Sequence, residues 1–313
     1  MSLMLAGLLA AASLTACGGS SSGDTTAAAA KEETTAGESA AAGESKAAES
    51  DTAAAAENGE KKVLRVAMEC AYAPYNWTQP DDANGAVPIA DSNEFANGYD
   101  VMWPKKISEE LGYDLEIVRL DWDSLIPAVT TGQVDCVIAG QSITSARLQA
   151  VDFSEPYYYA TIVTLTKKDS PFAAAKSVAD LKGATCTSQQ STIWYDTCLP
   201  QIPDAQIQPA AETAPAMVMQ LQTGTVDFVV TDLPTANGAV AKDENLVVLN
   251  FAGTEGDFQF ASEEERAENV NIGMSVAKGN TELLDAMNSV LSTMTEDDFN
   301  TIMDQAIAVQ PEV

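Results

Sequence analysis

The chain has 313 residues, of which 46% are hydrophobic, and this length suffices for one large or two medium domains. Its formal net charge of −30 disfavours binding to nucleic-acid phosphates and to anionic lipid headgroups. The sequence contains no histidine, which excludes Ser-His-Asp and Cys-His nucleophile systems and removes the commonest metal ligand. We therefore expect no metal site, no cofactor and no nucleic-acid partner.

An apolar run over residues 3–16 opens the chain and leads into Cys17. It is shorter than the roughly 20 residues that span a bilayer, and it is typical of a signal-peptide core. The small residues before Cys17 resemble a bacterial lipobox, which implies a signal peptide over 1–16 and lipidation of the Cys17 thiol. A buried helix is the alternative. No Lys or Arg precedes the run, so we expect the natural chain to begin further upstream.

Residues 17–60 are rich in Ala, Ser, Thr, Gly and Glu and contain no aromatic residue. Such a composition cannot bury enough apolar surface to offset the entropy of ordering. We expect a disordered tether that holds a folded domain away from a membrane surface.

The composition becomes globular after the tether. The run Val63–Met68 predicts a strand. Trp103, Ile107 and Leu111 stand at helical spacing, and Gly112 predicts the end of that helix. Three further elements are predicted in chain order: a strand over 115–118, a helix over 124–130 and a buried strand over 134–139.

A short internal repeat follows. The segment 131–137, TGQVDCV, recurs at 223–229 as TGTVDFV, and each copy follows a short amphipathic helix. Each copy predicts the end of a helix at Gly and then a buried strand. The repeat indicates two lobes of similar build, each with a parallel sheet of the βα type.

The residues after each copy are polar. Ser142, Thr144 and Arg147 follow the first copy, and Asp232 follows the second. Open α/β sheets bind ligands at the carboxyl ends of their strands. If the two edges face each other, the gap between a cation and a carboxylate suits a zwitterion.

Cysteines are sparse and no two are spaced as C-x-x-C, so a zinc ribbon or a thioredoxin-like site is not expected. Cys136 is interpreted as a small buried residue. Cys186 and Cys198 flank a predicted turn, and the sequence leaves open whether they form a disulfide or stay free.

Several segments together resemble the bacterial extracellular solute-binding proteins of family 3, the polar amino-acid receptors of ABC importers. The resemblance covers about 61–313. In order along the chain, the matching segments are 64–75, 98–101, 122–128, 142–147 with 151–157, 226–232 and 277–283.

This resemblance implies an α/β fold of the type II periplasmic-binding-protein-like class, with two α/β lobes joined by a two-strand hinge and a ligand cleft between them. The crossover strands are expected near 159–161 and 268–271. Lobe 1 then comprises 61–158 and 272–313, and lobe 2 comprises 159–271. Two departures from the family pattern are a polar insertion after Trp77 and the sequence Gln190-Ser191-Thr192 in a turn that usually contains Gly.

For the ligand's α-carboxylate the resemblance implies a fork of charge-assisted bonds from Arg147. Ser142 adds a hydroxyl, and Thr144 caps a helix whose positive end points at the same anion. Ser191 and Thr192 close the anion site from lobe 2. The alternative for Arg147 is a solvated surface cation.

The resemblance also implies which residues contact the α-ammonium and the side chain of the ligand. Asp232 accepts from the α-ammonium, and a cap of the following helix is its alternative or additional role. Tyr72 and Trp122 form aromatic walls, with plain core packing as the alternative, and Gln141 is a further wall residue. Glu69 meets the ligand side chain and favours a basic one, or is merely solvated.

The function that follows is an extracytoplasmic, lipid-anchored binding protein that acts as a monomer at the outer face of the cell membrane and delivers a free amino acid to the permease of an ABC importer. The chain is not expected to be an enzyme. Two alternatives remain: a ligand-sensing module for a membrane receptor, and a cyclic-acid dehydratase of the same fold.

Overall fold

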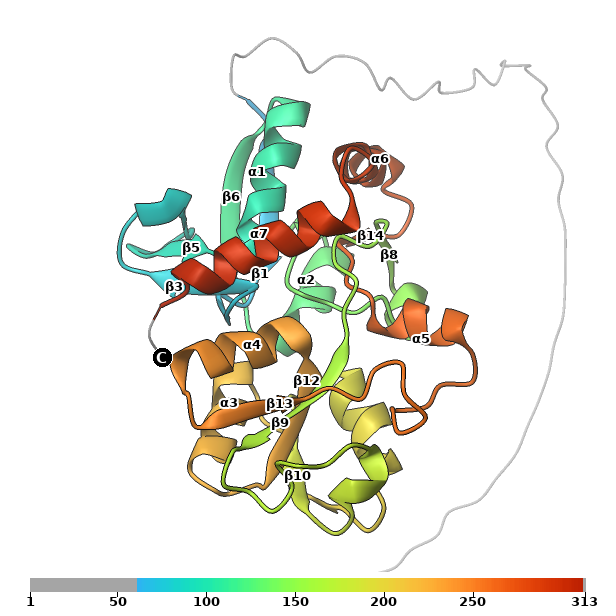
Figure 1. The fold of residues 1–313 in the computed structure, drawn as a ribbon. Helices are drawn as coiled ribbons and strands as arrows, with labels where there is room; N and C mark the ends of the chain where they lie inside the picture. The colour runs from blue at the N-terminus through green and yellow to red at the C-terminus, as the bar shows by residue number, and fades with distance from the viewer. Residues whose placement is uncertain (1–60, 312–313) are drawn as a thin grey trace, which may run out of the picture. The chain divides into compact units, whose positions relative to one another are not determined.

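The computed structural model describes residues 61–311 (Figure 1). The expected signal peptide, the lipidation site Cys17 and the tether over 17–60 lie outside the described residues. Within the part that is described, no helix is long and apolar enough to cross a membrane.

The first five-stranded sheet defines lobe 1. It is built from β1 (Val63–Met68), β6 (Asp114–Arg119), β7 (Cys136–Val137), β8 (Val151–Phe153) and β14 (Ser275–Ala277). The order across the sheet is β6-β1-β7-β14-β8. β1 pairs in parallel with β6 and β7, whereas β14 runs antiparallel to β7 and β8.

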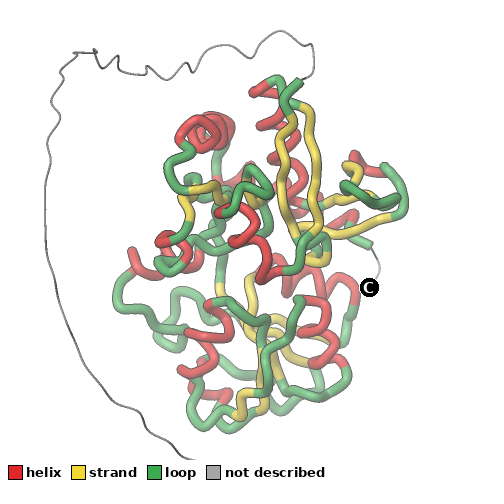
Figure 2. The backbone as a smooth tube through the Cα atoms, turned by 180° about the vertical axis from the view of Figure 1, so that it is seen from behind, coloured by secondary structure: helices red, strands yellow, loops and turns green. Residues whose placement is uncertain are grey.

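The second five-stranded sheet defines lobe 2. It is built from β9 (Ile162–Lys167), β10 (Thr185–Thr187), β11 (Gln206–Ile207), β12 (Phe228–Asp232) and β13 (Leu246–Leu249). The order is β11-β10-β12-β9-β13, with β10 parallel to its neighbours and β9 antiparallel to β12 and β13. Figure 2 shows the strands of the two sheets from behind.

The two sheets therefore share one topology, as the internal repeat predicts, but each is a mixed sheet, whereas a parallel sheet was expected. In each sheet the antiparallel strand is the first strand after the chain crosses from the other lobe. β9 is the first strand after the chain leaves the β1 sheet, and β14 is the first strand after it returns. A strand that enters from the other lobe runs opposite to its neighbours, and this makes both sheets mixed.

The repeated Asp has the same structural role in both lobes. Oδ2 of Asp135 accepts a hydrogen bond from the backbone N–H of Arg65 on β1 at 2.7 Å. Oδ2 of Asp227 accepts one from the N–H of Thr185 on β10 at the same distance, 2.7 Å. Asp135 directly precedes β7, and Asp227 directly precedes β12. Each carboxylate thus ties the start of its strand to the neighbouring parallel strand, β1 or β10. The sequence repeat is a repeat of sheet architecture.

Seven helices surround the sheets of the described chain. They are α1 (Tyr99–Leu111), α2 (Leu125–Thr130), α3 (Ala214–Gln222), α4 (Leu233–Lys242), α5 (Glu263–Val270), α6 (Thr281–Leu291) and α7 (Glu296–Val309). The predicted helix around Trp103 is confirmed as α1. It ends at Gly112, whose φ of 69° suits a residue without Cβ. Trp103 and Ile107 are buried in the lobe 1 core.

The polar insertion after Trp77 is part of a third, four-stranded sheet. This sheet has the order β2-β3-β5-β4. Its strands are β2 (Ala71–Tyr72), β3 (Asn76–Gln79), β4 (Val87–Pro88) and β5 (Phe95–Asn97). β2 belongs to the loop that follows β1, so the insertion packs beside a segment that was predicted to bind ligand.

The second passage between the lobes differs from the expected strand over 268–271. Glu268 lies inside α5, which Ser262 caps by accepting from the N–H of Glu265. Three Glu residues in the first turn complement the positive end of this helix. The chain pairs only afterwards, where Ile272 exchanges backbone hydrogen bonds with Tyr157 and Tyr158 at 2.9 Å each.

Two further features are a contact between helices of the two lobes and the state of two cysteines. Gln310, directly after α7, donates from Nε2 to the carbonyl oxygen of Gly238 on α4 at 3.1 Å, and α7 and α4 lie side by side (Figure 1). Cys186 and Cys198 are both buried in lobe 2, and both are free thiols in the structure.

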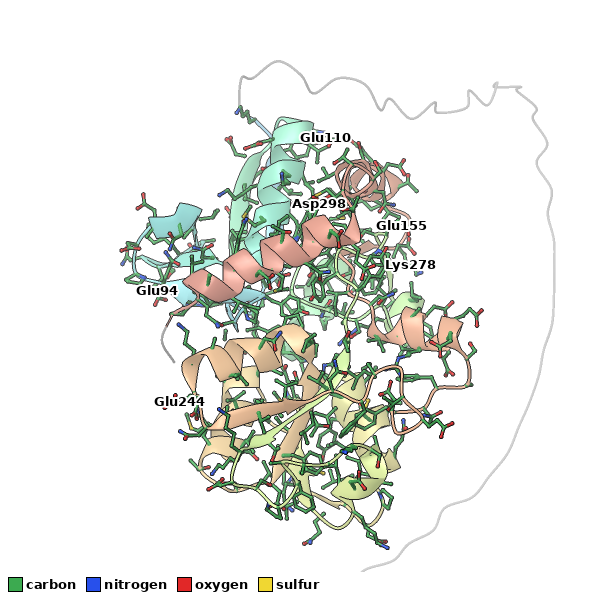
Figure 3. The ribbon with its side chains drawn as sticks, in the orientation of Figure 1. Glu94, Glu110, Glu155, Glu244, Lys278 and Asp298 are labelled. Carbon is green, nitrogen blue, oxygen red and sulfur yellow. The ribbon has the colours of Figure 1, made fainter. Side chains whose placement is uncertain are left out.

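Many carboxylates of this acidic chain lie at the surface of both lobes. Figure 3 labels exposed examples from helices and loops: Glu94, Glu110, Glu155, Glu244 and Asp298.

Candidate functional site

A cleft of about 490 Å³ lies between residues of both lobes. Six of the predicted site residues line it: Trp122, Gln141, Thr144 and Arg147 from lobe 1, and Ser191 and Thr192 from lobe 2. The other four are not part of this lining; they are Glu69, Tyr72, Ser142 and Asp232, and all four are buried. The structure therefore divides the predicted site into an open cleft and a closed, buried region.

Arg147 is the cation of the cleft. One guanidinium nitrogen, Nη1, donates to the carbonyl oxygen of Ser142 at 2.8 Å, and Nη2 donates to that of Ser191 at 3.1 Å. The guanidinium carbon lies 5.3 Å from the centre of the Trp122 ring. Desolvation lowers the pKa of Arg147 to about 10, so the group stays cationic at neutral pH. Arg147 is thus a cation held between both lobes and not a free surface residue.

The helix predicted after Thr144 is not present as such. Oγ1 of Thr144 does accept from the N–H of Arg147 at 3.2 Å, as a cap would. Only a 3-10 turn, Arg147–Gln149, follows. Because so short a turn sums few peptide dipoles, it provides little of the expected positive helix end. The positive charge at this edge comes from the guanidinium.

The lobe 2 edge of the cleft is also less regular than predicted. Ser191 adopts a left-handed backbone with φ 56°. The Thr192 hydroxyl donates to the carbonyl oxygen of Gln189 at 2.7 Å, so this hydrogen atom is already used. The helix that these residues were expected to open is a π-helical turn, Trp194–Cys198, and the turn carries Asp196 into the cleft lining.

Asp232 connects the lobes in the buried region. Its Oδ1 accepts from the N–H of Thr235 at 2.9 Å and so caps α4, which confirms the capping alternative. Its Oδ2 accepts from the Tyr72 hydroxyl of lobe 1 at 2.6 Å. Burial raises the pKa of Asp232, and the bonds from Tyr72 and Thr235 oppose that shift. Tyr72 also stacks on Tyr75, with ring centres 4.8 Å apart.

Glu69 ends in a buried carboxylate that the protein leaves largely uncompensated. The residue follows β1, is 6% exposed, and neither oxygen has a well-formed hydrogen bond. Burial raises the pKa of Glu69 to about 7; the Gln189 side chain opposes the shift, while Asp121 and Asp123 add to it. Buried charges are normally paired. Within residues 61–311 no group of three or more Cys, Asp or Glu is arranged to hold a metal ion.

Asp100, which is fully buried on α1, holds the two loops that carry these residues. Its carboxylate accepts from Asn76 Nδ2 and from the Tyr157 hydroxyl, both at 2.7 Å. Asn76 in turn accepts from the N–H of Cys70 at 2.6 Å, and the Tyr157 oxygen accepts from the N–H of Gly140 at 2.9 Å. Burial raises the pKa of Asp100 to about 7. The network fixes the strand ends after β1 and β7 relative to each other.

Asp123 and the contact that it makes were not predicted from the sequence. Asp123 lines the cleft beside Trp122, and its Oδ2 accepts from Nε2 of Gln190 of lobe 2 at 2.8 Å. The only available signals were its position next to Trp122 and the replacement of the usual Gly-containing turn at Gln190. Asn269 of α5 is a further lining residue that was not predicted.

Comparison with known proteins agrees with this architecture. The family model described as bacterial extracellular solute-binding proteins, family 3, matches residues 64–307. The arginine-binding extracellular protein ArtP of Bacillus subtilis is 26% identical over 242 residues, which cover 77% of this chain and 83% of ArtP. The L-cystine-binding protein TcyA of the same organism is 29% identical over 238 residues, 76% of this chain and 78% of TcyA.

Solved structures give the same picture. An amino acid ABC transporter substrate-binding protein from Streptococcus pneumoniae bound to L-arginine is 25% identical, with a TM-score of 0.67; the match covers 80% of this chain and 95% of that one. The arginine-bound form of truncated ArgBP from T. maritima is 30% identical, with a TM-score of 0.59; the match covers 74% of this chain and 96% of that one. These structures confirm the predicted two-lobed α/β fold.

Proposed function

Because the chain belongs to the bacterial extracellular solute-binding proteins of family 3, it is an amino-acid-binding protein of an ABC transporter and not an enzyme, and we propose that its ligand is a cationic amino acid. Relatives named for arginine, histidine and cystine share its family, so membership alone does not choose the ligand. The choice rests on the buried carboxylate of Glu69 and on the charges that line the cleft.

Glu69 is the observation that carries the proposal. A buried carboxylate with no well-formed hydrogen bond is stabilised by an added cation, and an ammonium or guanidinium side chain supplies one. Asp123 and Asp196 line the open cleft itself, where Arg147 is the one cation among the lining residues. A ligand with a second positive charge therefore gains more than a neutral amino acid.

The α-carboxylate of such a ligand is assigned to Arg147. Its two observed bonds engage two of the five N–H donors of a guanidinium. Ser142, Thr144, Ser191 and Thr192 surround this pole as further polar groups. The aromatic face of Trp122 supports the guanidinium. Gln141 offers an acceptor to the ligand, because its buried Oε1 has no hydrogen-bond partner among the described residues.

The α-ammonium is assigned to Asp232, with Tyr72 as its companion. Asp232 and Arg147 belong to different lobes, so one zwitterion contacts both poles only when the lobes are closed. Binding then shifts the population toward the closed state, and the importer reads that state.

A panel of the twenty amino acids with ornithine and cystine tests the proposal by thermal shift and calorimetry. L-arginine, L-lysine or L-ornithine should stabilise the protein most, and Arg147→Ala should abolish the response. No response to any free amino acid would contradict amino-acid binding itself. A response limited to neutral or acidic amino acids would contradict only the cationic ligand.

We further propose that the protein works as a monomer with lobes divided at 61–158, 159–271 and 272–313, tethered through residues 17–60 to a lipid on Cys17 at the outer face of the membrane. The sequence from residue 3 to Cys17 supports this localisation. In a bacterial host, the wild type should incorporate labelled palmitate and sediment with membranes. Cys17→Ser should do neither; lipid incorporation into that variant would refute the site.

Delivery to a permease is proposed over docking to a membrane sensor. Crosslinking of the ligand-bound protein in native membranes distinguishes the two. Recovery of an ABC permease supports transport, whereas recovery of a receptor kinase or chemoreceptor without any permease contradicts it.

A further inference from the structure

Asp123 and Gln190 face each other at the exposed rim of the cleft, outside the poles assigned to the ligand. Nε2 of Gln190 donates to Oδ2 of Asp123 at 2.8 Å. Asp123 belongs to the turn Trp122–Ser124 of lobe 1, and Gln190 follows β10 of lobe 2. The bond therefore joins the two lobes directly.

Each of these residues is fixed by its own lobe. The N–H of Gln190 donates to the carbonyl oxygen of Ala211 at 2.9 Å, and Gln189 forms a parallel bridge with the same Ala211. In lobe 1, the N–H of Ser124 donates to the carbonyl oxygen of Asp121 at 2.9 Å and closes the turn around Asp123. Because neither backbone reaches across the cleft, the side-chain bond forms only when the lobes come together.

The bond is continuous with the contacts of Arg147. Trp122, the neighbour of Asp123, lies under the guanidinium, and Ser191, the neighbour of Gln190, accepts one of its hydrogen bonds. Trp122 and Asp123 of lobe 1 thus face Gln190 and Ser191 of lobe 2, and Arg147 contacts both Trp122 and Ser191. Formation of either contact, Asp123 with Gln190 or Arg147 with Ser191, brings the partners of the other contact close together.

We propose that Asp123 and Gln190 form a latch that stabilises the closed lobes and sets the affinity for every ligand of the cleft by one common factor. The latch rests on the proposed function, because it acts on the same cleft. Since it joins two protein groups, it acts through the fraction of molecules that are closed. That fraction scales the apparent dissociation constant of all ligands equally.

The first test compares Gln190→Ala with Gln206→Ala. Gln206 is an exposed residue of lobe 2 whose Nε2 donates to the carbonyl oxygen of Gly183 at 3.1 Å, within the same lobe. Dissociation constants and dissociation rates for L-arginine, L-lysine and L-glutamine are measured by calorimetry and stopped-flow fluorescence. A side-chain hydrogen bond to a carboxylate at an exposed rim corresponds to about a threefold change in binding.

Gln190→Ala should raise the dissociation constant of every ligand by that same factor, through faster dissociation. Gln206→Ala should bind each ligand as the wild type does. Unchanged affinity in Gln190→Ala overturns the latch. A loss confined to one ligand also overturns it, because that pattern identifies Gln190 as a group that touches a particular side chain.

A double-mutant cycle separates the bond from the charge of Asp123, which also acts on Glu69. Asp123→Ala should weaken cationic ligands more than neutral ones, since it removes both the bond and a negative charge. Adding Gln190→Ala to it should cause no further loss. Additive losses would show that the two side chains act independently and would refute the latch.

A ligand-free measurement keeps the latch testable apart from the proposed function. Gln190→Glu places a second carboxylate opposite Asp123, and the like charges repel. Small-angle X-ray scattering should show a larger radius of gyration for this variant than for wild type without any amino acid. An equal radius refutes the latch, whereas failure of the wild type to bind any amino acid refutes the proposed function.

Discussion

The hydroxyl of Tyr72 in lobe 1 donates a 2.6 Å hydrogen bond to the carboxylate of Asp232 in lobe 2, across 160 positions of sequence. This one bond orients the carboxylate assigned to the ligand's ammonium and joins the lobes behind the cleft. Removing it should therefore weaken binding without unfolding either lobe.

We expect Tyr72→Phe to weaken binding of the preferred amino acid about tenfold, as for a hydrogen bond to a buried charge. Tyr75→Phe is the matched control, because the Tyr75 hydroxyl is buried beside Tyr72 and has no hydrogen-bond partner among residues 61–311. Calorimetry measures both. Equal or tighter binding in Tyr72→Phe would mean that the hydroxyl competes with the ligand for Asp232 instead of supporting it.

Arg147 should be the most sensitive position of the cleft. Arg147→Ala removes the carboxylate partner and the contacts to Ser142 and Ser191, so we expect at least a hundredfold loss of affinity. Arg147→Lys keeps the charge but not the planar fork, and its loss should lie between. Titration followed by Trp fluorescence checks both. If Arg147→Lys loses as much affinity as Arg147→Ala, the geometry of the guanidinium and not its charge decides binding.

Glu69 should make binding of cationic amino acids depend on pH. Its pKa of about 7 in the free protein falls when a cationic ligand arrives, so binding releases a proton at acidic pH. Affinity for L-arginine should therefore rise from pH 5.5 to about 7.5 and then level off. In Glu69→Gln this rise should disappear and the preference for cationic over neutral amino acids should be lost; persistence of either contradicts the assigned role.

The same carboxyl predicts an unusual dependence of stability on pH without ligand. Because its pKa is raised from 4.5 to about 7, the folded state binds more protons than the unfolded state between these values. The free energy of unfolding therefore falls as pH rises through this window. Glu69→Gln removes the fall and should be more stable than wild type at pH 8, by about 3 kcal/mol. Chemical denaturation at pH 4.5 and 8 measures the difference, which should vanish at the lower pH.

The four described cysteines should behave as inert thiols. Cys70, Cys136, Cys186 and Cys198 are buried and free, and burial raises the pKa of each. In a protein that lacks Cys17, a thiol reagent should label none of them under native conditions and all four in guanidinium. Two unreactive positions in the denatured protein would reveal a disulfide between Cys186 and Cys198.

The sequence was sufficient to predict what local patterns control. The strand Val63–Met68 and the end of α1 at Gly112 follow from periodicity and backbone freedom. The repeat around Asp135 and Asp227 predicted the similarity of the lobes, because its carboxylate makes the same bond in each sheet. Arg147 and Asp232 were proposed as ligand-binding residues because they follow buried strands at the edges where α/β sheets bind ligands.

What the sequence did not predict depends on contacts between distant segments. A buried strand over 134–139 was expected, yet only Cys136–Val137 finds partners on both sides. The turn that begins at Arg147 stays short because it ends at Gln149 and β8 already begins at Val151. The bond between Asp123 and Gln190 and the unpaired state of Glu69 follow from how the lobes meet, and no local pattern encodes that.

The bond from Gln310 to Gly238 has a practical consequence for biosensor design. It links the residue that follows α7 to a helix of the other lobe, and a Cβ added at Gly238 would lie only 3.0 Å from the Gln310 side chain. A fluorescent protein fused directly behind Gln310 would share in any movement between α7 and α4. Its signal would then report domain motion, but its bulk would also shift the equilibrium being reported. Probes at Glu110 and Glu244, both exposed and on different lobes (Figure 3), avoid that interference.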